Sequence, residues 1–175
     1  MMMGAAQQGA DVTHNRWMTV PRTLCFVFHD DEILLMRRGP HKKIFPNQYN
    51  GLGGHIERDE DPLSSARREI LEESGIEVQD LRLCAVYNID SGHQTGIVLF
   101  VFAGNSSTRA DLPPCDEGTL HWVKLDQLET FDLVEDIAFI VPRVRALPVG
   151  APPLFIHVSY DADDQLQMRV AGEQA

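Results

Sequence analysis

The sequence predicts an α/β domain in which helices pack on a mixed β-sheet. Its 175 residues suit one domain and are enough for a hydrophobic core. The expected elements follow the order strands, helix, strands, helix, strands, which favours a layered architecture. One helix, at residues 62–74, has an apolar face and follows a long loop rich in glycine and proline. We expect residues 1–17 to be a disordered leader and residues 18–175 to form a single domain.

The sheet is expected to begin with a hairpin. Residues 22–28 (RTLCFVF) are rich in β-forming side chains, HDDE follows as a turn, and residues 32–38 return as a second strand. Residues 39–54 then form a long loop that contains four glycines and two prolines. Loops of this length inside a domain usually carry function.

The helix at residues 62–74 has signals at both ends. Asp61 can cap its first turn, Pro62 suits its first position, and Gly75 suits the left-handed residue that follows its end. Leu63, Ala66 and Ile70 recur at helical spacing, so this face should pack on the sheet.

The rest of the chain is expected to add strands and two shorter helical segments. Strands are predicted at residues 81–89, 96–103 and 119–123, and helical segments at 126–129 and 134–146. The second segment should be broken or bent at Pro142, because proline removes a helical hydrogen bond. The runs LFIHVSY and QLQMRV around the turn DADD predict a closing hairpin.

Charge and hydropathy exclude several classes of partner. The net charge of −11 disfavours binding to a nucleic-acid polymer, whose backbone the protein would repel. The longest apolar run, residues 97–103, is far too short to span a membrane. We therefore expect a small-molecule ligand and a monomer or a homodimer.

Cysteine usage points to a reducing compartment. Cys25, Cys84 and Cys115 are odd in number, widely spaced and without a CxxC motif, so a disulfide framework and a structural zinc site are disfavoured. MMMGAAQQGADVTHN has no basic start and no sustained apolar segment, so we expect no secretory signal. These features predict a cytoplasmic protein with free thiols.

Three carboxylates are crowded on the predicted helix. Glu69, Glu72 and Glu73 share one face, and each like-charge pair costs roughly 0.2–0.5 kcal/mol. A divalent cation would reverse this repulsion, since Mg²⁺ is usually held by one or two carboxylates and substrate phosphates. Gly53 and Gly54 let the loop backbone approach closely, so a carbonyl there could be a further ligand. The alternative is a solvated acidic helix face.

Basic residues lie beside these features. Arg68 can hold a neighbouring carboxylate through a bidentate pair, and Glu60 can fix the loop or a metal-bound water. A basic patch is formed by Arg37, Arg38, Lys42 and Lys43. It precedes the stretch with Gly51, Gly53 and Gly54, which we call the glycine loop (residues 51–54). We expect Arg37 or Arg38, with Lys42 or Lys43, to contact substrate phosphates; the alternative is a solvated loop.

The stretch from Gly54 to Ile76 matches one signature in full. Gly54, five residues, Glu60, seven residues and then REILEESGI resembles the signature of the Nudix hydrolases at every specified position. The resemblance implies an α/β/α sandwich around a mixed β-sheet, with a catalytic loop–helix–loop. It also implies hydrolysis of nucleoside diphosphate derivatives with Mg²⁺, or with Mn²⁺.

The resemblance also implies roles for individual residues. Glu69, Glu72 and Glu73 would be metal ligands, together with the carbonyl of Gly54. Glu69 or Glu73 would be the general base.

Three residues outside this ligand set also receive roles. Arg68 would be an electrostatic partner of the ligands, and Glu60 would support them without touching the metal. Glu117 is placed like a further acidic ligand, with Asp116 as its nearest competitor; the alternative for Glu117 is a simple loop carboxylate.

Segments outside the signature resemble the MutT-like branch that hydrolyses oxidised purine nucleoside triphosphates. These segments are MRRGP, NQYNGLGGH, DEGTLHWVKLDQL, LVEDIAF and LFIHVSY. By this resemblance Asn50 and Asp136 would bind the purine edge. Ile137 stands where some members have a second aspartate, and Val134 where the animal enzyme has a base-stacking tryptophan, which predicts looser base selectivity.

The leading hypothesis is a Mg²⁺-dependent pyrophosphohydrolase that converts nucleoside triphosphates to monophosphates and pyrophosphate. A second hypothesis keeps the fold but changes the substrate to ADP-ribose, a nucleotide sugar or a dinucleoside polyphosphate. A third is a non-catalytic module that binds nucleotides. The intact glutamate set disfavours the third, because a module that only binds could lose those like charges.

Overall fold

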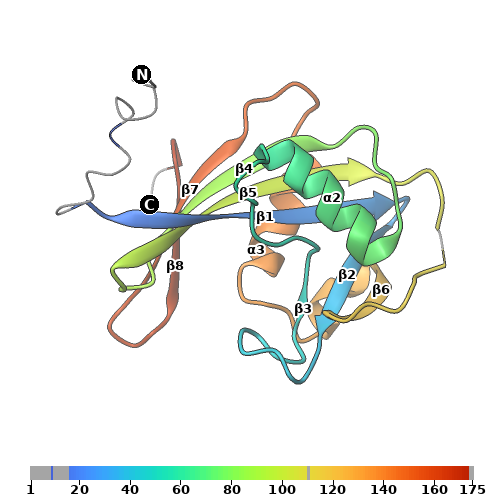
Figure 1. Cartoon of the computed structure of the whole chain (residues 1–175), viewed down its shortest axis with the longest axis horizontal. Helices are drawn as coiled ribbons and strands as arrows, with labels where there is room; N and C mark the ends of the chain where they lie inside the picture. Colours follow the sequence, from blue (N-terminus) through green and yellow to red (C-terminus); the bar gives the residue numbers. More distant parts are fainter. Residues whose placement is uncertain (1–8, 10–15, 110, 174–175) are drawn as a thin grey trace, which may run out of the picture.

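The computed structural model describes Gly9, residues 16–109 and residues 111–173. Most of the expected leader therefore lies outside the described residues, and Arg16 and Trp17 are exposed. The predicted mixed sheet with helices on both faces is confirmed (Figure 1).

The strands form one mixed sheet. Its order is β3-β2-β1-β5-β4-β7-β8, and β6 also pairs with β2. The β1–β5 and β4–β7 pairs are parallel, and the others are antiparallel. The strands are β1 (Met18–His29), β2 (Glu32–Arg38), β3 (Tyr49–Asn50), β4 (Arg82–Ile89), β5 (Thr95–Asn105), β6 (Gly118–Lys124), β7 (Leu154–Tyr160) and β8 (Leu166–Val170). The helices are α2 (Pro62–Ser74), the 3-10 helix η1 (Leu125–Thr130) and α3 (Ile137–Ala146).

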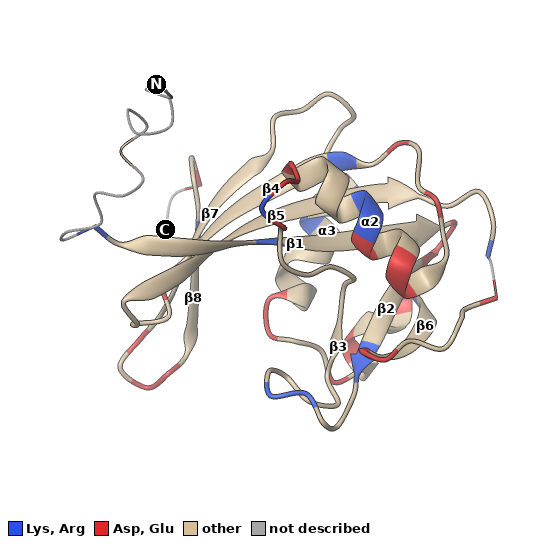
Figure 2. Cartoon of the chain, viewed as in Figure 1, with Lys and Arg blue, Asp and Glu red and all other residues tan. Residues whose placement is uncertain are grey.

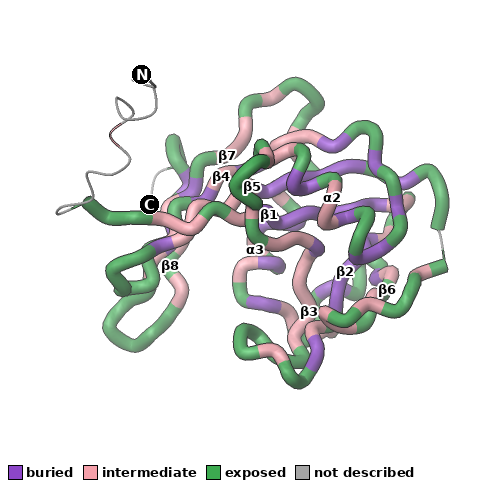
Figure 3. The backbone as a smooth tube through the Cα atoms, viewed as in Figure 1, coloured by how far each residue is buried: buried purple, intermediate pink, exposed green. Residues whose placement is uncertain are grey.

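Two hydrophobic clusters cover the two faces of this sheet. Alternate residues of a strand point to opposite faces, so Phe26 packs in one cluster and Cys25 in the other. Helix α3 contributes Ile140 to the first cluster, and helix α2 contributes Ile70 to the second. The central strands are therefore buried on both sides, whereas the loops are exposed (Figure 3).

The helix predicted from its end signals has the predicted boundaries. Asp61 Oδ1 accepts hydrogen bonds from the backbone N–H groups of Leu63 and Ser64 at 2.9 and 3.0 Å. Gly75 is left-handed, with φ 70°, and its N–H donates to the carbonyl of Leu71. Asp61 and Gly75 thus bind backbone groups at the two ends of α2.

Other elements differ from the sequence-based expectation where long-range pairing decides. Strand β1 begins at Met18 rather than at residue 22, because residues 18–22 pair with β5. Strand β3 was expected to be loop, but it pairs with β2. Helix α3 begins at Ile137 rather than at residue 134 and continues through Pro142, so it is not broken there. The missing N–H of Pro142 would have bound the carbonyl of Ala138, and both residues are exposed.

None of the helices among the described residues is long and apolar enough to cross a membrane.

The glycine loop pairs with β1 as a short extra strand. Cys25 and Leu52 exchange backbone hydrogen bonds of 2.7 and 3.1 Å, and the N–H of Thr23 donates to the carbonyl of Gly54 at 2.9 Å. Gly53, between them, has φ 128°, and a Cβ there would lie 2.3 Å from the carbonyl oxygen of Thr23. The loop can approach β1 in this way only with glycine at position 53.

We predict that Gly53→Ala lowers the free energy of unfolding by about 1–3 kcal/mol or more, because a strained φ and a backbone clash act together. Urea denaturation measures this loss. Gly92→Ala is the matched control, since Gly92 also has a positive φ (75°) but a Cβ there would meet nothing within 4 Å. Equal losses in the two variants would contradict the proposed close approach.

Candidate active site

A cavity of about 750 Å³ connects the acidic face of α2 with the segment before α3. Its walls come from parts of the chain that are far apart in sequence. They include the glycine loop, the glutamates of α2, the segment before β6 and residues of β1, β4 and β5. The cavity therefore brings together the predicted metal ligands and the predicted purine-binding residues, among them Gly54, Glu69, Glu72, Glu73, Glu117, Asn50 and Asp136.

Glu73 is the most buried of the three helix glutamates. It is 7% exposed, and its Oε2 accepts a hydrogen bond of 3.0 Å from the backbone N–H of Gly53. Burial raises the pKa of Glu73 to about 8, more than the Gly53 hydrogen bond lowers it. The negative charge of Glu69 adds to this rise. Without a cation nearby, Glu73 is therefore costly to ionise.

Arg68 binds the other carboxylates of the helix region. Its Nε and Nη2 donate to the two oxygens of Glu60 at 2.6 and 3.0 Å, which is a bidentate pair. Its Nη1 donates to Glu69 at 3.0 Å and to Glu72 at 3.1 Å, and Nη2 also donates to the carbonyl of His55. Arg68 thus joins the helix to the loop that precedes it. Figure 2 shows acidic and basic segments side by side along α2.

The pKa values of Glu60 and Glu69 shift in opposite directions. The hydrogen bond from Arg68 lowers the pKa of Glu60 to about 2. Burial raises the pKa of Glu69, although Arg68 opposes the rise. Arg68 is therefore the counter-charge of this face, as its place in the sequence suggests.

The helix glutamates supply the right atoms for Mg²⁺ but do not form a ready-made cage. Among the described residues, no group of three or more His, Cys, Asp or Glu is arranged to hold a metal ion. Glu69 and Glu72 turn toward Arg68, and Glu73 turns toward Gly53. The donors are nevertheless hard oxygens that line one cavity, which fits Mg²⁺. The side chain of Glu72 is 59% exposed, so it can turn from Arg68 to a cation.

The backbone of Gly54 lies against one of these carboxylates. A Cβ at Gly54 would be 2.5 Å from Glu69 Oε1. Its carbonyl accepts from the N–H of Thr23 and still has a second lone pair. The backbone of Gly54 is therefore adjacent to Glu69, one of the predicted metal ligands.

Glu117 lines the same cavity and forms an ion pair with Lys42 of the basic patch. Its charge contributes to the raised pKa of Glu73, so the two carboxylates are close enough to interact. Asp116 also lines the cavity but is exposed. Glu117 is thus near the predicted metal site, and a cation would compete with Lys42 for it.

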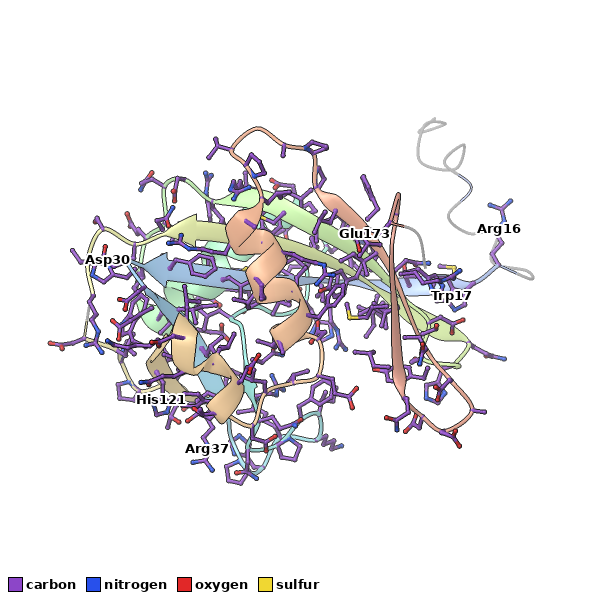
Figure 4. All side chains as sticks on the ribbon, turned by 180° about the vertical axis from the view of Figure 1, so that it is seen from behind. Arg16, Trp17, Asp30, Arg37, His121 and Glu173 are labelled. Carbon is purple, nitrogen blue, oxygen red and sulfur yellow. The ribbon has the colours of Figure 1, made fainter. Side chains whose placement is uncertain are left out.

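The basic patch divides into two parts. Arg38 lines the cavity, and its Nε donates to the carbonyl of Ile44 at 2.8 Å. Arg37 does not line the cavity; its Nε donates to the carbonyl of Asn47, and Figure 4 shows its side chain pointing outward. Lys43 is exposed as well. Of the two arginines predicted to bind phosphates, only Arg38 is therefore in place.

The predicted purine-binding residues Asn50 and Asp136 also line the cavity. Asn50 Oδ1 accepts from the N–H of Gly51 at 2.8 Å, so this side chain also shapes the turn. Asp136 occupies the N-cap position of α3, but its side chain makes no capping hydrogen bond, and burial raises the pKa of its carboxyl to about 6. Ile137 and Val134 are both buried in the hydrophobic core, so neither replaces the polar or stacking group expected there.

Three further residues that line the cavity have no functional signal in the sequence. Arg22, Leu99 and Tyr87 come from β1, β5 and β4 and line the cavity. Each looks like an ordinary strand residue in the sequence. Only the register of the three strands brings them together.

Comparison with known proteins identifies the family. The NUDIX domain model matches residues 18–144, which is more than half of the chain. The chain therefore belongs to the Nudix family. The Nudix domain and its structural neighbours support a hydrolase that acts on diphosphate bonds.

Two curated relatives differ in how much they cover. The oxidized purine nucleoside triphosphate hydrolase of Mus musculus is 29% identical over 132 residues, 69% of this chain and 76% of the relative. The m7GpppN-mRNA hydrolase NUDT17 of Danio rerio is 38% identical over 56 residues, 32% of this chain, and the match spans only 19% of that protein's length.

Solved structures support the fold. The MutT protein of Bacillus halodurans has a TM-score of 0.72 at 24% identity, covering 89% of this chain and 99% of that one. The NUDIX domain of Shewanella oneidensis NrtR, solved with ADP ribose, has a TM-score of 0.63 at 17% identity, covering 82% and 97%. The α/β/α sandwich predicted from the signature is thus confirmed.

We predict that Asp136→Asn removes a pH dependence of stability in the metal-free protein. The folded-state pKa of Asp136 is about 6, above the unfolded value of about 3.9. A raised folded-state pKa contributes stability that is fully present below the unfolded pKa and is lost as pH rises through the folded value. Wild type should therefore lose stability relative to Asp136→Asn between about pH 4 and pH 6, by at most about 1.4 kcal/mol per pH unit. Urea denaturation in excess chelator measures the difference, and a flat difference would contradict the prediction.

Proposed function

We propose that the protein is a Mg²⁺-dependent nucleoside triphosphate pyrophosphohydrolase that prefers oxidised purine nucleotides. It would convert these triphosphates, as NTPs or dNTPs, to monophosphates and pyrophosphate. The main support for this proposal is that one cavity is lined by the glutamates of α2 together with Asn50 and Asp136. The mouse relative, named an oxidized purine nucleoside triphosphate hydrolase, supports the same substrate class.

Glu69, Glu72, Glu73 and the carbonyl of Gly54 would hold Mg²⁺, or Mn²⁺, with Glu117 as an additional ligand. When bound, the cation offsets the charge of the phosphates and lowers the pKa of a coordinated water. The chain would place the triphosphate beside it through Arg38, which lines the cavity next to the glycine loop.

Glu73 or Glu69 would accept the proton of the attacking water. In each carboxylate one oxygen accepts a hydrogen bond, Glu73 Oε2 from the N–H of Gly53 and Glu69 Oε1 from Arg68, which leaves the other oxygen to accept the proton. The oxygen of the water forms a new P–O bond, and the bond between the α- and β-phosphoryl groups breaks to release pyrophosphate.

At the far end of the cavity, Asn50 and Asp136 would bind the edge of the base. Asn50 offers an amide donor, and the carboxyl of Asp136 donates when protonated and accepts when ionised. A site built in this way rejects a base that leaves its polar groups unpaired. With Val134 and Ile137 at neighbouring positions, selectivity should be looser than in enzymes with a tryptophan and a second aspartate.

The proposal is tested by a substrate panel in which products are identified. The panel contains canonical and oxidised purine triphosphates, pyrimidine triphosphates, ADP-ribose and dinucleoside polyphosphates. Release of pyrophosphate and a monophosphate, fastest from an oxidised purine, is the expected result. Preferential cleavage of ADP-ribose or a dinucleoside polyphosphate would replace the proposed substrate, and no turnover on any of them would favour a binding module.

We predict that Glu72→Gln and Glu73→Gln each abolish turnover without unfolding the protein. The substitutions remove metal ligands but relieve like-charge repulsion, so the metal-free variants should be as stable as wild type or slightly more stable. Steady-state rates with added Mg²⁺ and thermal melting in chelator measure the two effects. Glu77→Gln removes the same charge at an exposed position beyond α2 and should keep full activity. Full wild-type activity in excess chelator would disprove the metal requirement.

We predict that Asn50→Ala and Asp136→Ala narrow the selectivity between oxidised purine and pyrimidine triphosphates. Losing one buried hydrogen bond should cost about 1–3 kcal/mol of discrimination. The ratio of kcat/KM values measures this, and metal dependence should stay intact. If both variants keep the wild-type ratio, the base is recognised by other residues.

A further inference from the structure

Two residues that line the cavity each have a buried polar atom without a protein partner. Within the part of the chain that the structure describes, Arg22 Nε and Tyr87 Oη are the buried side-chain nitrogen and oxygen atoms that have no hydrogen-bond partner. Both residues line the cavity, and Tyr87 is 0% exposed. Buried polar groups in folded proteins are nearly always hydrogen-bonded, and a group left without a partner is costly. Two such atoms in one cavity indicate that a ligand completes them.

Strand register places these two residues in one row. Arg22 of β1 is the partner of Leu99 of β5, and Leu99 is also the partner of Tyr87 of β4. Residues in register point to the same face of a sheet, so the row runs from a cation across an apolar side chain to a phenol. Two strand spacings separate its ends by about 10 Å. Such a row suits a flat ring system that lies over Leu99 and has polar groups at both ends.

The two ends of the row face different parts of the proposed site. The backbone of Arg22 forms an isolated β-bridge with that of His55, which directly follows the glycine loop. The positive charge of Arg38 is close enough to lower the pKa of Arg22. Burial is the larger cause of that shift. Arg22 is thus at the phosphate end of the cavity.

Tyr87 is at the end formed by Asp136. Burial, and then the charge of Asp136, raise the pKa of Tyr87, so its hydroxyl stays protonated. A neutral phenol can both donate and accept a hydrogen bond. Tyr87 and Asp136 therefore provide two neighbouring side chains in the cavity that can each donate or accept a hydrogen bond.

We propose that Tyr87 is a specificity-determining residue whose hydroxyl hydrogen-bonds to the purine of the substrate, while Arg22 Nε donates to an oxygen of its sugar–phosphate part. The proposal rests on the proposed function and adds two binding residues to it. A bicyclic base extends further across Leu99 than a monocyclic one, so purines can contact Tyr87 and pyrimidines cannot. The Arg22 contact is common to all nucleotides.

The test uses nucleoside monophosphates in excess chelator, so that neither metal nor turnover is involved. Dissociation constants of GMP, AMP, CMP and UMP are measured by calorimetry for wild type and variants. Tyr87→Phe removes only the Oη atom and should weaken binding of a purine monophosphate about tenfold, equivalent to about 1.4 kcal/mol. It should leave the pyrimidine monophosphates unchanged. The melting temperature of Tyr87→Phe should not fall, because the substitution removes a buried hydroxyl that has no partner in the protein.

Two further variants separate the contacts. Tyr49→Phe is the matched control; its ring packs against Phe131 and His121 outside the cavity, so all four affinities should stay at the wild-type value. Arg22→Met should weaken all four nucleotides alike. An unchanged purine affinity in Tyr87→Phe, or equal losses for purines and pyrimidines, would overturn the proposal, as would a wild type that binds no monophosphate.

Failure of this proposal can be distinguished from failure of the proposed function. A wild type that hydrolyses triphosphates, with unchanged purine affinity in Tyr87→Phe, would overturn the role of Tyr87 alone. A wild type that binds purines through Tyr87 but hydrolyses nothing would support Tyr87 and overturn the hydrolase proposal.

Discussion

The close passage of residues 52–54 between β1 and α2 is the constraint on which the site depends. On one side the loop exchanges backbone hydrogen bonds with Thr23 and Cys25. On the other, the N–H of Gly53 binds the carboxylate of Glu73, and the backbone of Gly54 lies against Glu69. A side chain at Gly53 would clash with β1, and one at Gly54 would meet the carboxylate of Glu69. This passage therefore fixes the position of the acidic face relative to β1.

The negative charges of the site are only partly compensated within the protein. Arg68 compensates Glu60, Glu69 and Glu72, and Lys42 compensates Glu117. Glu73 has no cationic partner among these contacts and has a strongly raised pKa because it is buried. A divalent cation would supply the missing charge and would release Glu72 and Glu117 from their basic partners. In this account the basic residues hold the carboxylates in place while the metal is absent.

The acidic helix could be predicted from local sequence signals. The features that could not be predicted depend on pairing between strands that are far apart in the sequence. Asp61, Gly75 and the spacing of the glutamates act within a few residues, so α2 and its acidic face follow from the sequence. The early start of β1 depends on β5, more than seventy residues away, and β3 depends on β2. The row of Arg22, Leu99 and Tyr87 needs the register of three strands, for which the sequence has no local signal. Arg37 and Arg38 are adjacent in sequence, yet only Arg38 lines the cavity, since neighbouring strand residues point to opposite faces.

The central claim is that one cavity holds the metal and phosphates at α2 and the base beside Tyr87 and Asp136. The most direct test is a crystal structure with Mn²⁺ and a non-hydrolysable purine triphosphate, with anomalous diffraction used to locate the metal. The account predicts manganese between the triphosphate and the carboxylates of Glu69, Glu72 and Glu73, with the purine lying over Leu99. Manganese bound away from these glutamates, or a base outside the cavity, would contradict it.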